Sequence, residues 1–358
     1  MSRRNTQTAR FVPPGTKQKV NITMPDLILL TGITGFIAKH VAADLLNAGY
    51  SVRGSLRDLD RIQEVKESLK PVVTDRASLS RLSFVTLDLM QDKGWDTAMD
   101  GVAAVIHTAS PFPGAAPKDA EELIRPAVDG ALRALRAAQA AGVTRVVLTS
   151  SVVAIMQREL ADGDTITPAM WSDLDHASMT AYAASKTMAE RAAWDFVADH
   201  PEMQLTTINP GLVLGAPLDN HYGTSLDLVD QMISGKLPVL PNFGLAIVDV
   251  ADVARAHVAA LTTPESVGKR FLLAADYVMA RDLVAMLRTA APRARLPRVV
   301  VPKLVARALG LVSSQIRSLV PLIGKRLSVD NAGTRDVLGI TFIPAQDAVK
   351  ASVRALRP

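Results

Sequence analysis

The stretch LILLTGITGFIAKHV, from Leu27 to Val41, runs from an apolar segment through two glycines into a helical pattern. Gly32 lies where a strand must turn sharply, and Gly35 lies where a bare backbone lets a ligand approach closely. Ala38 completes the spacing Gly-x-x-Gly-x-x-Ala, at a position where a helix packs on a strand. The helix N-terminus would direct unsatisfied N–H groups at this turn, which suits a pyrophosphate. Tight strand–helix turns also use glycine without any ligand, so other segments must decide between the two interpretations.

Apolar segments typical of strands alternate with helical patterns up to about Leu214. The segments expected to form strands are Leu27–Leu30, Ser51–Leu56, Leu82–Leu87, Ala103–His107, Val143–Leu148 and Gln204–Ile208. Between them, Phe36–Asn47 and Asp129–Ala140 carry alanine, leucine and charged residues at 3.6-residue spacing. Short strands that alternate with longer helices predict right-handed βαβ units, so we expect an α/β fold with a doubly wound parallel sheet.

The composition excludes several classes of protein. The chain of 358 residues is 48% hydrophobic and 21% charged, as in ordinary globular proteins. It contains no cysteine, which excludes disulfides and thiolate metal sites. The six histidines form no His-x-x-x-His pair, and no apolar run reaches the roughly eighteen residues of a membrane span. We therefore expect a cytoplasmic protein with no metal and no membrane span.

The net charge of +5 is concentrated in the N-terminal segment. Residues 1–23 contain no acidic residue and five basic ones, Arg3, Arg4, Arg10, Lys17 and Lys19. The rest of the chain is balanced, which argues against nucleic acid as a partner. The segment also lacks the apolar core of a secretory signal. It is either a disordered basic extension or a stretch upstream of a native start at Met24.

A second basic segment lies near the C-terminus. Residues 283–329 carry basic residues and no acidic one, and residues 303–319 have an amphipathic pattern. A helical lid with a solvated basic face is the favoured interpretation. The alternative is peripheral docking on an anionic membrane or an acidic ligand.

The end of the second expected strand indicates the type of cofactor. A dinucleotide-binding enzyme that prefers NAD places an acid there to bind the ribose 2′-hydroxyl. Here Leu56 takes that place and Arg57 follows. A guanidinium suits a 2′-phosphate, with Arg61 or Arg53 in support, so the sequence favours NADPH over NADH. A surface arginine without a ligand is the alternative interpretation.

Two further segments carry residue types that catalyse proton transfer. In MTAYAASKTMAERAAW, Tyr182 and Lys186 are four residues apart and so share one helix face. A nearby ammonium lowers the pKa of a phenol from its usual value of about 10, which makes the hydroxyl useful near neutrality. Upstream, VVLTSSVVAI ends a strand with Ser150 and Ser151, where a hydroxyl could hydrogen-bond a substrate carbonyl.

The order and spacing of these motifs identify a family resemblance. The glycine turn, the strand-end serines, Tyr182-x-x-x-Lys186 and NPGLVLG are accompanied by VRGSLRD, LDL, HTASP and WSD. From about Met24 to Leu356, the chain resembles the extended short-chain dehydrogenase/reductases of the NAD-dependent epimerase/dehydratase superfamily. Within them it resembles the branch of dihydroflavonol reductases, cinnamoyl-CoA reductases and microbial aldehyde/ketone reductases.

The resemblance implies a domain organisation and a set of roles. It implies a seven-stranded Rossmann domain over residues 24–213, to which 244–262 returns, and a C-terminal substrate-binding lobe over 214–243 and 263–358. Ser151 and Tyr182 would polarise and protonate a carbonyl, and Lys186 would hold the nicotinamide ribose and tune Tyr182. The residues expected to contact NADPH are Gly32, Thr34, Gly35, Phe36, Ile37, Arg57, Asp88, Leu89, Thr108, Ala109, Ser110, Tyr182, Lys186, Pro210, Val213 and Ser225.

Departures from the family patterns restrict the substrate. Plant flavonol reductases place an asparagine five residues after the catalytic serine, where this chain has Met156. The Asn-Trp-Tyr-x-Tyr signature of cinnamoyl-CoA reductases is also absent. A pocket with Met156 and Phe112 suits a small hydrophobic aldehyde or ketone better than a polyphenol or a CoA ester. We expect an NADPH-dependent reductase of such a carbonyl, acting as a monomer or homodimer.

Three other functions share parts of this pattern. Sugar-nucleotide epimerases and dehydratases have the same serine, tyrosine and lysine, but they usually retain NAD, which Arg57 disfavours. Dehydratases also place acidic residues where this chain has Val152 and Val153. A 3β-hydroxysteroid-dehydrogenase-type enzyme would suit the amphipathic segment 303–319. Rossmann proteins that only sense the redox state of a cofactor typically lack the tyrosine–lysine pair, which is present here.

Overall fold

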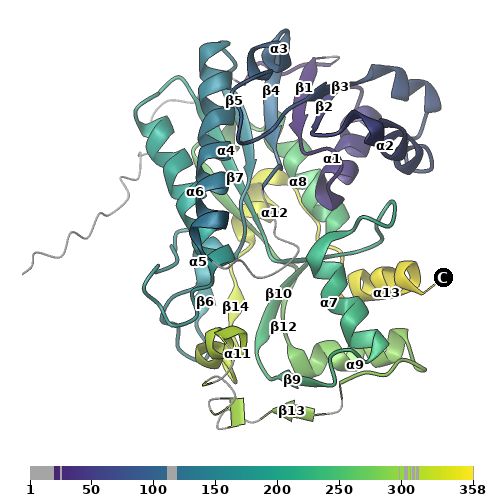
Figure 1. Cartoon of the computed structure of the whole chain (residues 1–358), viewed down its shortest axis with the longest axis vertical. Coiled ribbons are helices and arrows are strands. Elements are labelled where there is room, and N and C mark those ends of the chain that lie inside the picture. Colours follow the sequence, from purple (N-terminus) through teal and green to yellow (C-terminus); the bar gives the residue numbers. More distant parts are fainter. Residues whose placement is uncertain are drawn as a thin grey trace, which may run out of the picture.

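The computed structural model describes residues 20–24, 26–110, 119–297, 299–301, 305, 306, 308, 311 and 314–357. Helices cover both faces of a central sheet, and a smaller lobe lies beyond one end of the strands of that sheet (Figure 1). The five N-terminal basic residues and Phe112 lie outside the described residues, as does part of 303–319. Ile22, at the end of the expected extension, is described and packs against the core of the central domain.

The central sheet confirms the expected fold class. Its strands follow the order β11-β7-β5-β4-β1-β2-β3, and every pair in it is parallel. The chain crosses to the other half of the sheet after β3, as in doubly wound folds. The strands of this sheet are β1 (Leu27–Thr31), β2 (Ser51–Leu56), β3 (Leu82–Thr86), β4 (Val102–His107), β5 (Arg145–Thr149), β7 (Gln204–Pro210) and β11 (Lys269–Leu273).

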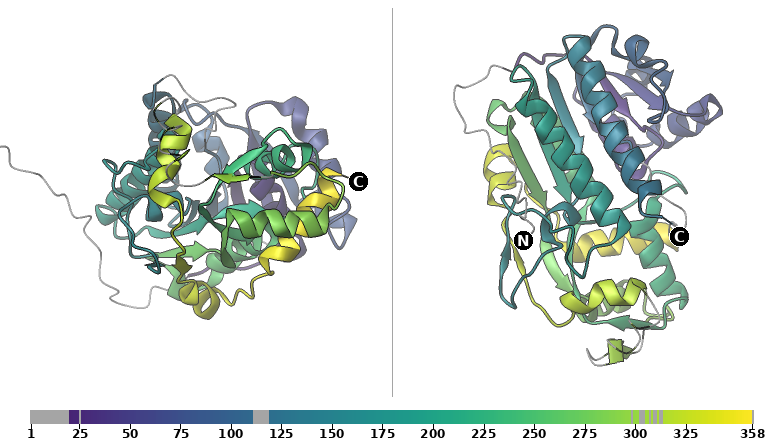
Figure 2. Two further views of the ribbon diagram at one scale, coloured as in Figure 1. Left: turned by 90° about the horizontal axis from the view of Figure 1, so that it is seen from below. Right: turned by 60° about the vertical axis from the view of Figure 1, so that its left-hand side comes forward.

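Helices lie in two layers because the strands are apolar on both faces. Ile28 and Leu30 of β1 pack in the same cluster as residues of α1 and α8, whereas Leu29 between them packs in the cluster with Leu135 of α4. The long helices α4 and α6 run side by side over one face (Figure 2). The helices of this domain are α1 (Phe36–Asn47), α2 (Ile62–Leu69), α3 (Trp95–Met99), α4 (Glu121–Ala140), α5 (Val153–Met156), α6 (Ala181–Ala198), α8 (Val250–Thr262) and α12 (Ala332–Leu338).

The smaller lobe has its own sheet and apolar core. Strand β10 pairs in parallel with β8 and antiparallel with β12, and two short parallel pairs, β9 with β13 and β6 with β14, lie beside it. Its strands are β6 (Thr165–Ile166), β8 (Leu212–Leu214), β9 (Val239–Pro241), β10 (Gly244–Asp249), β12 (Asp276–Met279), β13 (Val299–Val301) and β14 (Ser328–Val329). Its helices are α7 (Gly223–Ser234), α9 (Ala280–Ala290), α11 (Ser314–Leu319) and α13 (Ala345–Leu356).

The two parts exchange segments of the chain. Strand β11 comes from the range 263–358, which the sequence assigns to the lobe, yet it pairs with β7 and is the edge strand of the central sheet. Within the range 244–262, helix α8 packs on the central domain, whereas β10 belongs to the sheet of the lobe. Among the described residues, no helix has both the length and the apolar character that crossing a membrane requires.

Candidate active site

The glycine turn between β1 and α1 has the geometry of an anion-binding turn. Gly32 has a φ of 69°, and a Cβ at this position would lie 3.0 Å from Cα of Ala109. Gly35 is the N-cap residue of α1, and neither a side-chain cap nor an acidic residue in the first turn occupies that end. The N–H groups of residues 36 and 37 therefore face the turn without a side-chain partner at the cap, an arrangement that fits a phosphate group.

Arginines near the end of β2 differ in their partners. Arg53 donates to main-chain carbonyls at the end of α3 at 2.7, 2.9 and 3.3 Å, and Arg61 binds Glu64 at 2.7 Å. Arg57 is exposed and has no hydrogen bond or ion pair within the described part of the chain. Of the three candidates, Arg57 is thus the one whose guanidinium remains available to a ligand.

The carboxyl end of β4 holds a network around Thr31. The Thr31 hydroxyl accepts from the main-chain N–H of Ala109 at 3.1 Å and lies 2.9 Å from Nδ1 of His107. Burial, with the Lys186 charge, lowers the pKa of His107 to about 3, so the ring is neutral. Thr108, whose hydroxyl donates to the Thr31 carbonyl, belongs to the same network.

The proposed catalytic residues meet between β5 and α6. Ser151 follows β5 and is buried, and Tyr182 lies in the first turn of α6. This helix begins at a definite residue because the Thr180 hydroxyl accepts from the N–H of Ala183 at 3.1 Å. The hydroxyls of Ser151 and Tyr182 are hydrogen-bonded. Lys186 lies one turn further along the helix, and it is 9% exposed.

The electrostatics of this group differ from expectation in one respect. Burial raises the pKa of Tyr182, and the hydrogen bond with Ser151 only partly opposes it. The pKa of Tyr182 is therefore raised in this structure and not lowered as the sequence suggested, because the cost of removing a phenolate from water dominates. Burial also lowers the pKa of Lys186 to about 8, against the raising effect of the Glu190 carboxylate.

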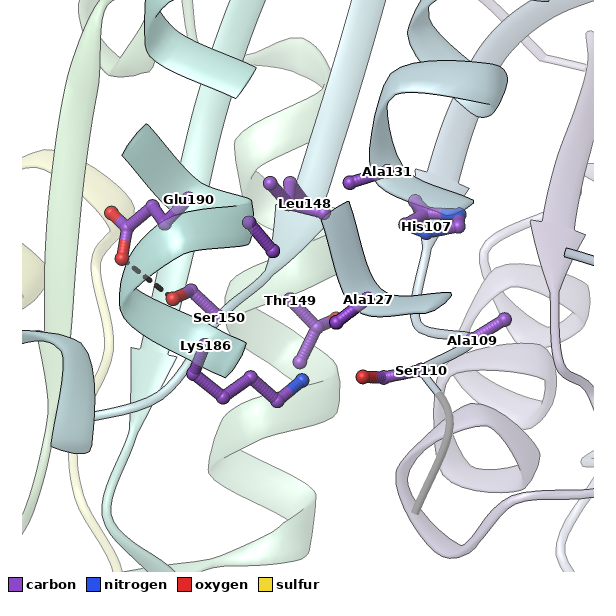
Figure 3. Close-up of a pocket in the computed structure, with 11 residues that line it drawn as sticks. His107, Ala109, Ser110, Ala127, Ala131, Leu148, Thr149, Ser150, Lys186 and Glu190 are labelled. Carbon is purple, nitrogen blue, oxygen red and sulfur yellow. Dashed lines mark hydrogen bonds between the residues drawn. The ribbon is translucent and has the colours of Figure 1, made fainter. Parts of the chain in front are cut away.

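A small hollow lies against these residues, between the ends of β4 and β5 and helices α4 and α6. His107, Ser110, Thr149 and Ser150 line it, and the Lys186 side chain extends across it towards Ser110 and Thr149 (Figure 3). Thr149 and Glu190 also line this hollow, and neither was among the site residues expected from the sequence. For Glu190 a signal was available, because it follows Lys186 by four residues on the same helix face.

The remaining expected contacts lie at strand ends or in the lobe. Asp88 and Leu89 follow β3, beside the end of β2, and the Asp88 carboxylate accepts from the N–H two residues later at 2.9 Å. Pro210 ends β7 and Val213 lies in β8, and both are buried. Ser225 lies in the first turn of α7, in the lobe rather than at the sheet edge.

Met156, the expected substrate contact that the structure describes, ends α5 and is 5% exposed. It packs in the apolar cluster of the lobe together with Ile155 and Leu226. The second expected substrate contact, Phe112, lies outside the described residues.

A charged cluster fastens the segment before α7 to α1. Lys39 is buried and forms ion pairs with Glu64 at 3.0 Å and with Asp219. His221 lies 3.3 Å from Glu64. The two carboxylates and this imidazole are close enough together to hold a metal ion, but the Lys39 ammonium already supplies the positive charge that they share.

Comparisons with known proteins agree with this arrangement. Cinnamoyl-CoA reductase 1 of Arabidopsis thaliana is 35% identical over 273 residues, 75% of this chain and 76% of that protein. Ketoreductase azaE of Aspergillus niger is 33% identical over 352 residues, 92% and 97% of the two chains. The crystal structure of yeast methylglyoxal/isovaleraldehyde reductase complexed with NADPH has a TM-score of 0.76 at 25% identity and covers 92% of this chain and 98% of that one. Residues 28–274 match the NAD dependent epimerase/dehydratase family. The seven-stranded sheet and the serine, tyrosine and lysine agree with this match. The chain therefore belongs to that family, in its branch of extended short-chain reductases.

Proposed function

We propose that this oxidoreductase is an NADPH-dependent reductase that transfers a hydride to the carbonyl of a small hydrophobic aldehyde or ketone. The observation that carries the proposal is the hydrogen-bonded pair of Ser151 and Tyr182, with the buried Lys186 one helical turn away. Two hydroxyl donors beside one ammonium suit a carbonyl oxygen that gains negative charge as it is reduced.

The residues at the strand ends fit NADPH. A Cβ at Gly32 would fill the space through which a pyrophosphate approaches the backbone, and α1 presents an uncapped N-terminus there. Arg57, exposed at the end of β2, would bind the 2′-phosphate through charge-assisted hydrogen bonds. When bound, NADPH supplies the hydride for the reduction.

The roles of the catalytic side chains follow from charge development. Ser151 and Tyr182 donate hydrogen bonds to the carbonyl oxygen, and these bonds strengthen as that oxygen becomes an alkoxide, so they stabilise the transition state more than the ground state. The Tyr182 hydroxyl then transfers its proton to the alkoxide oxygen. Lys186, as an ammonium, binds the ribose and stabilises the phenolate that remains until a proton returns from solvent.

The substrate class rests on the apolar surroundings of the serine. Met156 stands five residues beyond Ser151 and packs in an apolar cluster, so it offers no hydrogen-bonding group to a hydroxyl-rich substrate. A site that cannot pair buried polar groups discriminates against polyphenols and sugars. Small aliphatic or aromatic aldehydes and ketones can pack against such apolar side chains without leaving a polar group unpaired.

A substrate panel tests the proposal against its main rival. Aliphatic, aromatic and steroid carbonyls, together with UDP- and dTDP-sugars, are offered with NADPH or NAD, and turnover is scored by loss of nicotinamide absorbance and by sugar isomer. We expect NADPH consumption with small apolar carbonyls, and its loss in Tyr182→Phe. Epimerisation of a sugar nucleotide without net consumption of cofactor would replace the reductase with an epimerase.

A further inference from the structure

Glu190 lies on α6 behind the catalytic residues, one turn beyond Lys186 and two turns beyond Tyr182. Its side chain is fully buried, with an exposed fraction of 0%. An unpaired carboxylate in such a place would be costly by several kcal/mol, so its partners determine whether it is charged. Figure 3 shows its carboxylate pointing away from the Lys186 ammonium and accepting a hydrogen bond from Ser150.

Donors from β7, β11, α6 and the residue after β5 converge on this carboxylate. Burial opposes its ionisation, but the charge of Arg270 and the hydrogen bonds hold its pKa below the usual range. It is therefore a carboxylate, and it acts as the common acceptor of the cluster. The donors are Arg270 Nε at 2.6 Å, Ser150 Oγ at 2.5 Å, Asn209 Nδ2 at 2.7 Å, Thr207 Oγ1 at 2.9 Å and Trp194 Nε1 at 3.3 Å.

Two of these donors connect Glu190 to the catalytic serine. Ser150 immediately precedes Ser151, so the bond from its hydroxyl fixes the end of β5. Asn209 donates to Glu190 and also to the main-chain carbonyl of Ser151 at 3.3 Å. Through Ser150 before it and Asn209 at its carbonyl, the carboxylate therefore fixes the main chain on both sides of Ser151.

Arg270 extends the same support to the segment after the serine. Its guanidinium lies 3.7 Å from the ring centroid of Trp171 and donates to the main-chain carbonyls of Pro168 and Met170. Ser172, next to Trp171, donates to the Val153 carbonyl at 2.7 Å. Through these contacts, the WSD motif holds α5 in place, the helix that follows the catalytic serine.

Glu190 also acts on Lys186 through space. The ammonium extends away from it and across the hollow (Figure 3), and in this interior a charge acts over a longer range than in water. The residues that face Lys186 from other elements carry no charge: His107 on β4, which is neutral, Ala127 and Ala131 on α4, and Ser150 after β5. Arg270 on β11 forms an ion pair with Glu190 itself. The Glu190 carboxylate favours the charged form of Lys186.

We propose that Glu190 is a positioning residue for the reduction, one that keeps Lys186 an ammonium and fixes the backbone that presents Ser151. The proposal rests on the proposed function, because it assigns Glu190 a part in the same carbonyl reduction. It adds a residue that touches neither substrate nor cofactor and whose removal changes how the site depends on pH.

The electrostatic part is tested with Glu190→Gln, which keeps the shape and removes the charge. The control is Asp195→Asn, which removes a charge from an exposed position on the same helix. The titration of the Lys186 amine is followed by NMR of ¹⁵Nζ-lysine protein without substrate, and the signal is assigned with Lys186→Arg. We expect the midpoint to fall by about one unit or more in Glu190→Gln and to stay unchanged in Asp195→Asn. An unchanged midpoint in Glu190→Gln would overturn this part.

Because Glu190→Gln leaves Arg270 buried without its partner, the double variant Glu190→Gln/Arg270→Gln provides a second measurement. It removes both charges together, which a folded interior tolerates better than one unpaired charge. We expect a fall in the Lys186 midpoint that is smaller than in Glu190→Gln, because the Arg270 guanidinium, which disfavours a nearby ammonium, is lost as well. The alkaline limb of kcat should move down in pH by the same amount. A kcat profile that keeps its shape, with a lower melting temperature, would show a merely structural role.

Ser150→Ala tests the geometric part separately. Loss of the hydroxyl leaves the charge of Glu190 in place, so the Lys186 midpoint should stay unchanged while kcat falls about tenfold and the Kd of NADPH is preserved. An unchanged kcat would overturn the geometric part. If no variant or wild type reduces any carbonyl but the Lys186 midpoint still falls in Glu190→Gln, the proposed function fails and the electrostatic role of Glu190 stands.

Discussion

Replacing Arg57 by alanine should abolish the preference for NADPH over NADH and leave the stability of the fold unchanged. Arg57 is exposed at the end of β2 and has no hydrogen bond or ion pair to any described residue, so its removal breaks no internal contact. A charge-assisted hydrogen bond to a phosphate contributes roughly 1.5–3 kcal/mol. This corresponds to an increase of roughly 10- to 150-fold in the Kd of NADPH, with the Kd of NADH unaffected.

Neighbouring arginines supply matched controls for this measurement. Arg53 donates to three main-chain carbonyls and Arg61 binds Glu64, so alanine at either position should lower the melting temperature without changing cofactor preference. Both Kd values are measured by isothermal titration calorimetry at fixed ionic strength, since the phosphate contact weakens with salt. Equal affinities in wild type, or a parallel loss for both cofactors in Arg57→Ala, would refute the assignment. A selective loss in Arg61→Ala would transfer the role to that residue.

Three further predictions follow from burial and charge. Tyr182→Phe should lower kcat by about 10²–10⁴-fold and leave the Kd of NADPH nearly unchanged, as measured by steady-state kinetics and titration. Lys39→Met should lower the free energy of unfolding by about 3–5 kcal/mol in urea melts, because Glu64 and Asp219 lose the buried cation that they share. An unchanged free energy of unfolding would show that water screens these two carboxylates. Between about pH 6.5 and pH 4, stability should fall as pH falls, since burial lowers the pKa values of His40 and His257 to about 4 and the unfolded chain binds protons first. Urea melts of His257→Gln should show a shallower slope in this range.

The sequence alone predicts most of the central domain because its strands and helices have regular apolar periods. The expected helix Phe36–Asn47 has the same bounds as α1. Five of the six expected strands begin within one residue of the first residue of the observed strand. The exception is Val143–Leu148, which begins at Arg145 as β5. Val143 is apolar and buried, as Val146 and Val147 of the strand are, so hydrophobicity does not mark the point at which pairing with β7 begins.

Strand β11 and the buried ion pair of Glu190 with Arg270 were much harder to predict. The segment Lys269–Leu273 follows a long range that alternates little, and only its pairing with β7 reveals that it completes the central sheet. Glu190 and Arg270 are charged and therefore resemble surface residues in a sequence, although both lie inside the fold. They are separated by 80 residues, so their ion pair is a product of tertiary structure that no local period encodes.

The pKa of Tyr182 has a consequence for the direction in which the site works best. Burial raises this pKa, so the phenol keeps its proton throughout the neutral range and stands ready to donate to an alkoxide. Reduction needs that proton, whereas oxidation of an alcohol needs the phenolate to accept one. We therefore expect kcat for reduction to be highest near neutrality and below, and kcat for oxidation to rise steadily on the alkaline side until Lys186, with its pKa of about 8, loses its charge. Full pH profiles in both directions test this, and an oxidation rate that peaks below pH 7 would show that Tyr182 is ionised in the working enzyme.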